Sequence, residues 1–244
     1  MRTAAVALLA LGAAALALAA IEPIAIPAFS TAKPGPGLPA GWRLVTIPNR
    51  RAAELSLVRD GGRTVLRVHS ERAFGSAAHE LSVDPARASL LTWRWKIDRV
   101  VDKANLETKD GEDFAARVYV SFDYPVDQLP LATRTKLRLA RAFFGEVPAA
   151  AICYVWDNRH APGTAVWNPH YNYVRVVVLR SGNSRAGQWV EEKRDVEADF
   201  REAFGARWKK PVPPIAGVTV GNDTDQTGES ATAWFGDLRL EPRR

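Results

Sequence analysis

The chain has 244 residues and a formal net charge of +6, from 33 basic and 27 acidic side chains. Hydrophobic residues make up 47% of it and charged residues 25%, a globular composition that excludes a disordered chain. Its single cysteine, Cys153, excludes an intrachain disulfide and a cysteine-cluster metal site.

Residues 1–20 differ in kind from the rest of the chain. Arg2 precedes an apolar run, and Ala17-Leu18-Ala19 ends that run with a small-x-small spacing. This order is typical of a cleaved secretory signal; an uncleaved membrane anchor is the alternative, because the run is long enough to span a bilayer. In both cases we expect the rest of the chain to lie outside the cytoplasm, in a periplasmic or secreted protein, and cleavage leaves no membrane span in the mature chain.

Residues 21–40 are rich in proline, glycine and alanine. Such a composition predicts an extended linker or a strap over the surface. Neither a repeat nor a long structureless break follows, so residues 41–244 are predicted to form a single domain.

From residue 41 onward, short segments with the pattern of β-strands alternate with turn signals. In several of them apolar and polar residues alternate with a period of two, which a sheet with one buried face requires. Two others are almost wholly apolar, as in central strands buried on both sides. The predicted strands are 64–70, 90–98, 114–122, 149–156, 173–179, 215–220 and 230–240.

The alternation also assigns faces to two of these strands. We expect the core to hold Trp93, Trp95, Val118, Val120 and Phe122. The opposite faces carry charged side chains, and we expect these to leave the core: Arg94, Lys96 and Arg117.

Two helices interrupt the strands, at 132–144 and 195–204, with Asp195 as the N-cap of the second and Gly205 as its stop. Many strands, few helices and no alternation of strand with helix predict an all-β fold, an antiparallel β-sandwich or jelly roll. Asp237 among apolar residues in the last strand is a pattern familiar from carbohydrate-binding jelly rolls of the galactose-binding-like type.

Six segments of the chain, in order, carry a resemblance to a known family. They are TWRWKID (92–98), DGEDFAARVYVSFD (110–123), YVWDN (154–158), WNPHYNYVRVVVLRSG (167–182), GQWVEEKRDVEADFREAFG (187–205) and GVTVGNDTDQTGESATAWFGDLRL (217–240). Together they resemble an exported bacterial family catalogued as domain of unknown function 3047. The resemblance implies an exported setting and a sandwich fold, and it implies no activity.

A first group of candidate binding residues surrounds the start of strand 114–122. Asp110, Glu112 and Asp113 precede the strand, and Arg117 and Tyr119 follow on what the alternation gives as its polar face. An acid, a guanidinium and a phenol projecting together suit a sugar hydroxyl or a carboxylate. The alternative is a solvated acidic turn before an ordinary polar strand face.

A second group lies in the segment NDTDQTGES, residues 222–230. Asp223, Asp225 and Thr227 match EF-hand ligand spacing, but Trp234 stands where the twelfth, bidentate acid belongs, which excludes an EF-hand. A different oxygen-rich calcium site, with Glu229 as a further ligand, is the functional interpretation. The alternative is a turn in which these side chains bond their own backbone.

A third group joins aromatic rings with polar groups: Trp156 and Asn158, then Trp167 and His170. Ring faces that stack on sugars, beside groups that bond hydroxyls, suit glycan recognition. The alternative places Trp156 in the core and makes the connection a structural loop.

The first two groups are predicted to meet, because loops of an antiparallel sandwich gather at its two ends. The leading functional hypothesis is a non-catalytic binding module for a glycan or cell-envelope ligand. One alternative is a glycan hydrolase or lyase that pairs Asp113 with Glu229 or Asp225. A second alternative, a structural envelope protein, predicts no concave polar pocket. The basic residues at 134–141 lack interleaved aromatics, so no nucleic-acid partner is expected.

Overall fold

The computed structural model describes residues 24–144 and 147–243. The predicted signal at residues 1–20 lies outside these ranges. Within them, no helix is both long enough and apolar enough to cross a membrane.

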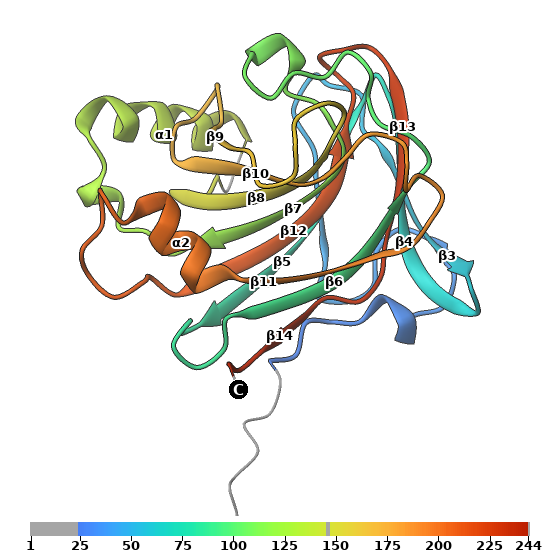
Figure 1. Cartoon of the computed structure of the whole chain (residues 1–244), viewed down its shortest axis with the longest axis horizontal. Coiled ribbons are helices and arrows are strands. Elements are labelled where there is room, and N and C mark those ends of the chain that lie inside the picture. The colour runs from blue at the N-terminus through green and yellow to red at the C-terminus, as the bar shows by residue number, and fades with distance from the viewer. Residues whose placement is uncertain (1–23, 145–146, 244) are drawn as a thin grey trace, which may run out of the picture.

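Two sheets face one another (Figure 1). The first sheet contains, in spatial order, β1 (Gly35–Pro36), β3 (Glu54–Asp60), β4 (Arg63–Glu71), β13 (Ser230–Phe235), β6 (Leu90–Ile97) and β11 (Val190–Asp195), and β14 (Arg239–Glu241) also pairs with β6. The second sheet contains β2 (Arg43–Val45), β5 (Phe74–Val83), β12 (Ile215–Asp223), β7 (Phe114–Phe122), β8 (Ala150–Asp157), β10 (Val174–Ser181) and β9 (Ala165–Trp167). The predicted all-β sandwich is confirmed, although β8 and β10 pair in parallel.

The core between the sheets is rich in aromatic rings. Trp95 packs edge-on against Trp93, with 5.6 Å between the ring centroids, and its centroid lies 5.9 Å from that of Trp156. The burial predicted for Trp93, Trp95, Val118, Val120 and Phe122 is confirmed. Arg94 and Lys96 leave the core, as predicted, and both are partly exposed.

Arg117 is the exception, because it is only 3% exposed. The prediction that it leaves the core was wrong because the outer face of the second sheet is not solvated around it. A second apolar cluster covers that face, and it includes Leu106 from the loop between β6 and β7. The other buried members are Phe114, Ala151, Cys153, Val155, Val174, Val176 and Val178.

A β-bulge in β7 changes the face of the sheet on which the residues before Arg117 lie. Gly221 of β12 pairs with Arg117, whereas Asp223 pairs with Phe114, so β7 carries one residue more than its partner here. Bulges of this kind redirect side chains. Phe114 therefore joins the outer cluster, while Ala115 and Ala116 both belong to the main core. The simple alternation of faces predicted for strand 114–122 therefore does not hold across the bulge.

Helices close one end of the sandwich. α2 (Val196–Phe204) begins where Asp195 accepts a hydrogen bond from the Ala198 amide, and it ends at Gly205, as predicted. Its Phe200 ring packs on Phe122 at 4.6 Å. The other helix, α1 (Leu131–Phe144), agrees with the predicted 132–144 segment, and three short 3-10 turns complete the set: η1 (Phe29–Thr31), η2 (Lys109–Gly111) and η3 (Val126–Gln128).

Residues 24–40 lie against the sandwich. Phe29 is fully buried, β1 pairs with β3, and Ile24 bridges to Leu240 near the other end of the chain. Asp237 accepts hydrogen bonds from the amide and hydroxyl of Ser30. The role of Asp237 in this structure is thus to tie the N-terminal strap to the last strands.

Candidate functional site

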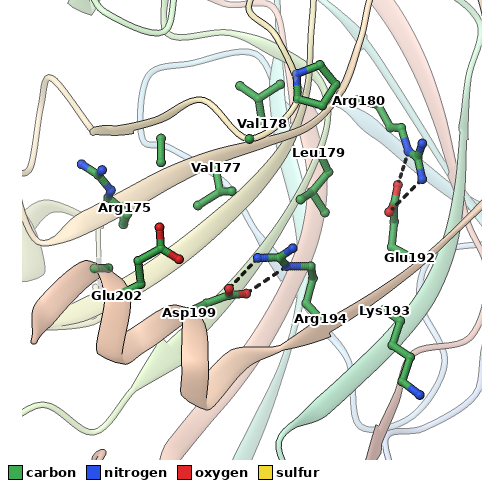
Figure 2. Close-up of a pocket in the computed structure, with 14 residues that line it drawn as sticks. Arg175, Val177, Val178, Leu179, Arg180, Glu192, Lys193, Arg194, Asp199 and Glu202 are labelled. Carbon is green, nitrogen blue, oxygen red and sulfur yellow. Dashed lines mark hydrogen bonds and ion pairs between the residues drawn. The ribbon is translucent and has the colours of Figure 1, made fainter.

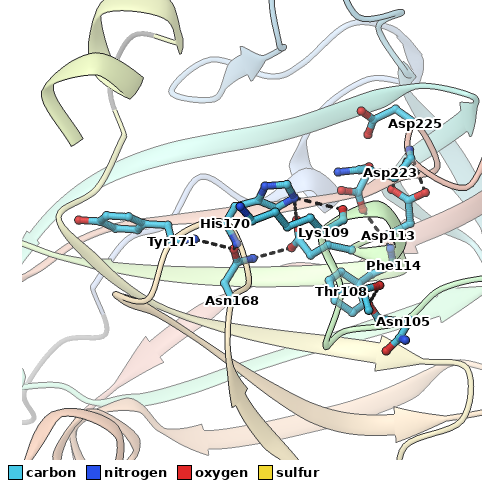
Figure 3. Close-up of polar contacts among 12 residues, drawn as sticks. Asn105, Thr108, Lys109, Asp113, Phe114, Asn168, His170, Tyr171, Asp223 and Asp225 are labelled. Atoms are coloured by element: carbon cyan, nitrogen blue, oxygen red, sulfur yellow. Dashed lines mark hydrogen bonds and ion pairs between the residues drawn. The ribbon is translucent and has the colours of Figure 1, made fainter. Parts of the chain in front are cut away.

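The two acid-rich segments meet, as their predicted end placement implied (Figure 3). Asp113 accepts hydrogen bonds from the backbone amides of Gln226 and Thr227 at 3.1 and 2.6 Å. In return, Asp223 accepts one from the amide of Phe114 at 3.0 Å. The acidic turn and the 222–230 loop are therefore joined by reciprocal bonds between a carboxylate of one and amides of the other.

A buried ion pair lies beneath this junction. Arg117 donates to Asp223 at 2.5 Å, and the two side chains are 3% and 2% exposed. Burial opposes the charge on Arg117, but Asp223 outweighs it and raises the pKa of the guanidinium above its usual value. The guanidinium also stacks over the rings of Phe74 and Tyr119, at 4.8 and 5.4 Å.

Three carboxylates converge here and form what we call the carboxylate cluster: Asp113, Asp223 and Asp225. One oxygen of each lies within 4.8 Å of the others. Asp113 is fully buried, and burial raises its pKa. Asp225 is nearly buried and pairs with Arg50 at 3.5 Å. The cluster therefore concentrates negative charge away from water.

Glu112 extends the polar network toward the 167–173 loop. It is buried and accepts a hydrogen bond from Asn168 at 2.7 Å. Burial raises the pKa of Glu112 to about 7, even though the nearby charge of Arg117 opposes that shift. His170 lies at the surface of this network, with Nε2 4.0 Å from the Glu112 carboxylate.

Glu229 is not part of the carboxylate cluster. Its carboxylate accepts hydrogen bonds from the amides of Asp102 and Lys103, at 3.1 and 2.8 Å. The expectation that Glu229 joins the metal ligands is corrected, because these amides already hold it against the β6–β7 loop. Thr227 contributes its backbone amide to Asp113.

The aromatic residues of the third group are engaged within the protein. Trp156 is 1% exposed and donates to the Gly182 carbonyl, so the expectation that it offers a ring face to a ligand is corrected. Asn158 holds the β6–β7 loop through the carbonyls of Asp102 and Ala104. Trp167 is partly buried and contacts two guanidinium groups and Phe204.

The residues proposed for paired-carboxylate catalysis do not flank an open cleft. Asp113 is fully buried beneath the 222–230 loop, and the carboxylate of Glu229 is held by two amides. Glycoside hydrolysis needs two carboxyl groups about 5 to 10 Å apart with room for the sugar between them. Neither pairing of Asp113 provides that room in this structure.

Calcium binding stays a prediction, now assigned to the carboxylate cluster. The fit is partial: three carboxylates supply only some of the roughly six to eight oxygens that Ca²⁺ takes, and backbone amides already bond Asp113. We expect calcium to raise the melting temperature of the wild type, since a ligand bound only by the native state stabilises it. Differential scanning fluorimetry with calcium and with chelator measures the change.

Asp225→Asn should remove that rise, and Asp110→Asn should keep it because Asp110 is exposed and lies outside the cluster. A wild type that is indifferent to calcium contradicts the prediction. In that case the cluster is a structural ion network.

A cleft lies elsewhere, between the edges of the two sheets (Figure 2). Its volume is about 360 Å³, and we call it the β10–α2 cleft. Val177 and Leu179 of β10 provide apolar side chains, and α2 and β11 provide charged ones. The charged lining residues are Arg175, Arg180, Glu192, Lys193, Arg194, Asp199 and Glu202.

Two ion pairs hold the charged side chains of the cleft in place. Arg194 bonds both oxygens of Asp199, which also accepts from the hydroxyl of buried Tyr154. Arg180 bonds both oxygens of Glu192, at 2.7 and 3.2 Å. The sequence analysis missed these residues because they come from three different elements, β10, β11 and α2, and form no recognisable sequence motif.

Comparisons with solved structures find chains that are similar to this one only at low identity. The xyloglucanase domain of NopAA, a type three effector from Sinorhizobium fredii, is 8% identical, with 87% of this chain and 97% of that one covered at a TM-score of 0.47. A native family 12 xyloglucanase from Bacillus licheniformis is 9% identical, with 86% and 97% covered at 0.45. The non-crystalline cellulose specific carbohydrate-binding module CBM28 is 12% identical, with 82% and 87% covered at 0.37. Likenesses at this level carry no conclusion about activity.

The sequence comparisons establish the family of the chain. No curated protein matches the chain. A family model described as "Protein of unknown function (DUF3047)" matches residues 40–239, which is most of the chain and nearly all of the described sandwich. This chain therefore belongs to the DUF3047 family.

Proposed function

We propose that the protein is an exported, non-catalytic binding module for a glycan or related cell-envelope ligand, and that the ligand lies in the β10–α2 cleft. One observation carries the proposal: the cleft combines an apolar wall with rigidly held charged groups. Binding sites for sugars need both, because ring faces are apolar and hydroxyls require fixed hydrogen-bonding partners.

The two alternatives fit the cleft less well. A purely structural envelope protein gives no reason for a concave polar pocket. A hydrolase needs a pair of carboxyl groups, one of them free to donate a proton. Of the three that line the cleft, only Glu202 is outside an ion pair among the described residues, and Asp199 accepts bonds from both Arg194 and Tyr154. Glu192 is similarly bonded by Arg180 and by the Trp95 indole.

A variant that fills the cleft tests the proposal. Ala165 lines the cleft on the edge strand β9, and Ala165→Trp adds bulk there while suiting a strand. We expect this variant to lose binding of envelope oligosaccharides by about tenfold or more and to melt close to the wild type. Isothermal titration calorimetry measures the affinity.

The matched control is Ala132→Trp, at an exposed position of α1 away from the cleft lining, and it should bind like the wild type. If the wild type binds none of a panel of envelope oligosaccharides and peptidoglycan fragments, the proposal is wrong. Release of new reducing ends during the incubation would instead favour the hydrolase.

A further inference from the structure

Arg175 differs from the other arginines of the β10–α2 cleft in that no acid among the described residues hydrogen-bonds it or forms an ion pair with it, although Glu202 acts on it electrostatically. Its guanidinium lies over the ring of Trp167, 5.1 Å from the ring centroid. Within residues 24–144 and 147–243, no acceptor hydrogen-bonds this guanidinium and no carboxylate lies within 4.0 Å of it. A guanidinium stacked on an aromatic face keeps its in-plane N–H groups directed outward, ready for a planar anion.

Two of the three acids that line the cleft are paired with other arginines, and the third, Glu202, acts on Arg175 electrostatically without forming an ion pair with it in the part of the chain that the structure describes. Arg180 and Arg194 are neutralised by Glu192 and Asp199. Lys193 lies at the rim, and Figure 2 shows its ammonium directed away from the other labelled side chains. Four cationic and three anionic side chains line the cleft, so the lining carries a net charge of +1 when Lys193 is counted.

The surroundings of Arg175 oppose its charge. Partial burial lowers the pKa of Arg175; Glu202 counteracts this shift, and the neighbouring guanidinium of Arg207 adds to it. Arg207 lies over the same indole, 4.2 Å from the ring centroid. A bound anion would relieve the repulsion between the two guanidinium groups.

We propose that Arg175 binds the carboxylate of an acidic sugar, so that the cleft takes uronic-acid-containing glycans in preference to neutral ones. This inference rests on the proposed function of the cleft. The guanidinium fork matches a carboxylate in two parallel hydrogen bonds. A monoanion suits a lining whose net charge is no more than +1, and Glu202 and Asp199 would repel a dianionic phosphate more strongly than a carboxylate. Val177 and Leu179 offer apolar surface to the face of the sugar ring.

The test uses two ligands that differ only at the carboxyl group. They are an oligosaccharide of uronic acids and its carboxyl-reduced counterpart, in which each carboxylate is a hydroxymethyl group. By calorimetry at low salt, we expect the wild type to bind the acidic ligand about tenfold more tightly, since a charge-assisted hydrogen bond is worth this much. Added salt should reduce that preference.

Variants of Arg175 then assign the preference to this residue. Arg175→Gln is expected to lose the tenfold preference and to keep its affinity for the reduced ligand. Arg175→Lys should show a smaller preference, because it keeps the charge without the fork. Arg138→Gln on the exposed part of α1 removes the same charge elsewhere and should bind both ligands like the wild type. Circular dichroism checks that each variant is folded.

The outcomes separate the two proposals. If the wild type binds neither ligand, the proposed function of the cleft fails. If it binds both equally, or if Arg175→Gln keeps the preference, the assignment of Arg175 is wrong while a glycan-binding cleft still stands. Tighter binding of a phosphorylated oligosaccharide than of the uronate overturns the assignment of a carboxylate ligand.

Discussion

Arg117→Met is expected to lower the free energy of unfolding by about 3 to 5 kcal/mol, because it leaves Asp223 as a buried carboxylate without its cation. The amide of Phe114 would remain as a hydrogen-bond donor to Asp223, but Glu112 and Asp113 would then repel it unopposed. Urea denaturation at neutral pH, followed by tryptophan fluorescence, measures the loss.

Two controls interpret that loss. Arg201→Met breaks a surface pair with Glu197 one helical turn away and should cost about 1 kcal/mol or less. The double variant Arg117→Met/Asp223→Asn removes both charges and keeps an acceptor for the Phe114 amide, so it should recover most of the loss. If Arg117→Met lowers the free energy of unfolding no more than Arg201→Met does, the prediction that it leaves a buried, uncompensated charge is wrong.

Glu112→Gln is expected to stabilise the protein above neutral pH and to leave it unchanged in mild acid. Glu112 has a pKa of about 7 in the folded protein against an ordinary value of 4.5, so the folded state binds the proton of this carboxyl group more tightly than the unfolded state does. The stability contributed by this proton is present below pH 4.5 and is lost as the pH rises through 7. The loss is on the order of 3 kcal/mol, at about 1.4 kcal/mol for each unit of pKa shift.

Glutamine carries no titrating charge and still offers an acceptor to the Asn168 amide. The difference in unfolding free energy between Glu112→Gln and wild type should therefore grow from about pH 5 to about pH 8. Urea denaturation at four pH values in that range measures it. Glu107→Gln, at an exposed position of the same loop, should show no such growth. A difference that is constant across the range would mean that Glu112 does not titrate there.

Patterns with a local cause were predictable from the sequence. The inward faces of β6 and β7 follow from alternation alone, so Trp95 and Val118 were placed correctly. The limits of α2 follow from Asp195, which bonds an amide three residues ahead, and from Gly205. Both devices depend only on residues a few positions apart.

Features set by distant segments were not predictable. Alternation says that two residues share a face, but it does not say what covers that face; Leu106 comes from a loop and buries the side that holds Arg117. The bulge before Arg117 exists only in the pairing of β7 with β12. β11 was missed because its sequence, VEEKRD, is mostly charged, which an edge strand tolerates.

The candidate site divides in the same way. The placement of the acidic turn and of the 222–230 loop at the ends of the sandwich was predictable, because its loops gather there, but their meeting at the same end was not. The place of Glu229 was not, because it depends on amides of residues 102 and 103. The cleft was not predictable either, since Arg175 is isolated only in relation to the ion pairs around it.

The order of strands in the two sheets constrains how the chain reaches its native state during synthesis. β13 lies between β4 and β6, and β12 lies between β5 and β7, so residues 215–235 fill the middle of both sheets. A growing chain that ends before residue 215 holds the flanking strands with unpaired edges on both sides of two gaps. Such edges pair readily with other chains. Residues 215–235 therefore protect the edges of the four flanking strands, all of which are synthesised before them, from pairing with other chains: β4, β5, β6 and β7.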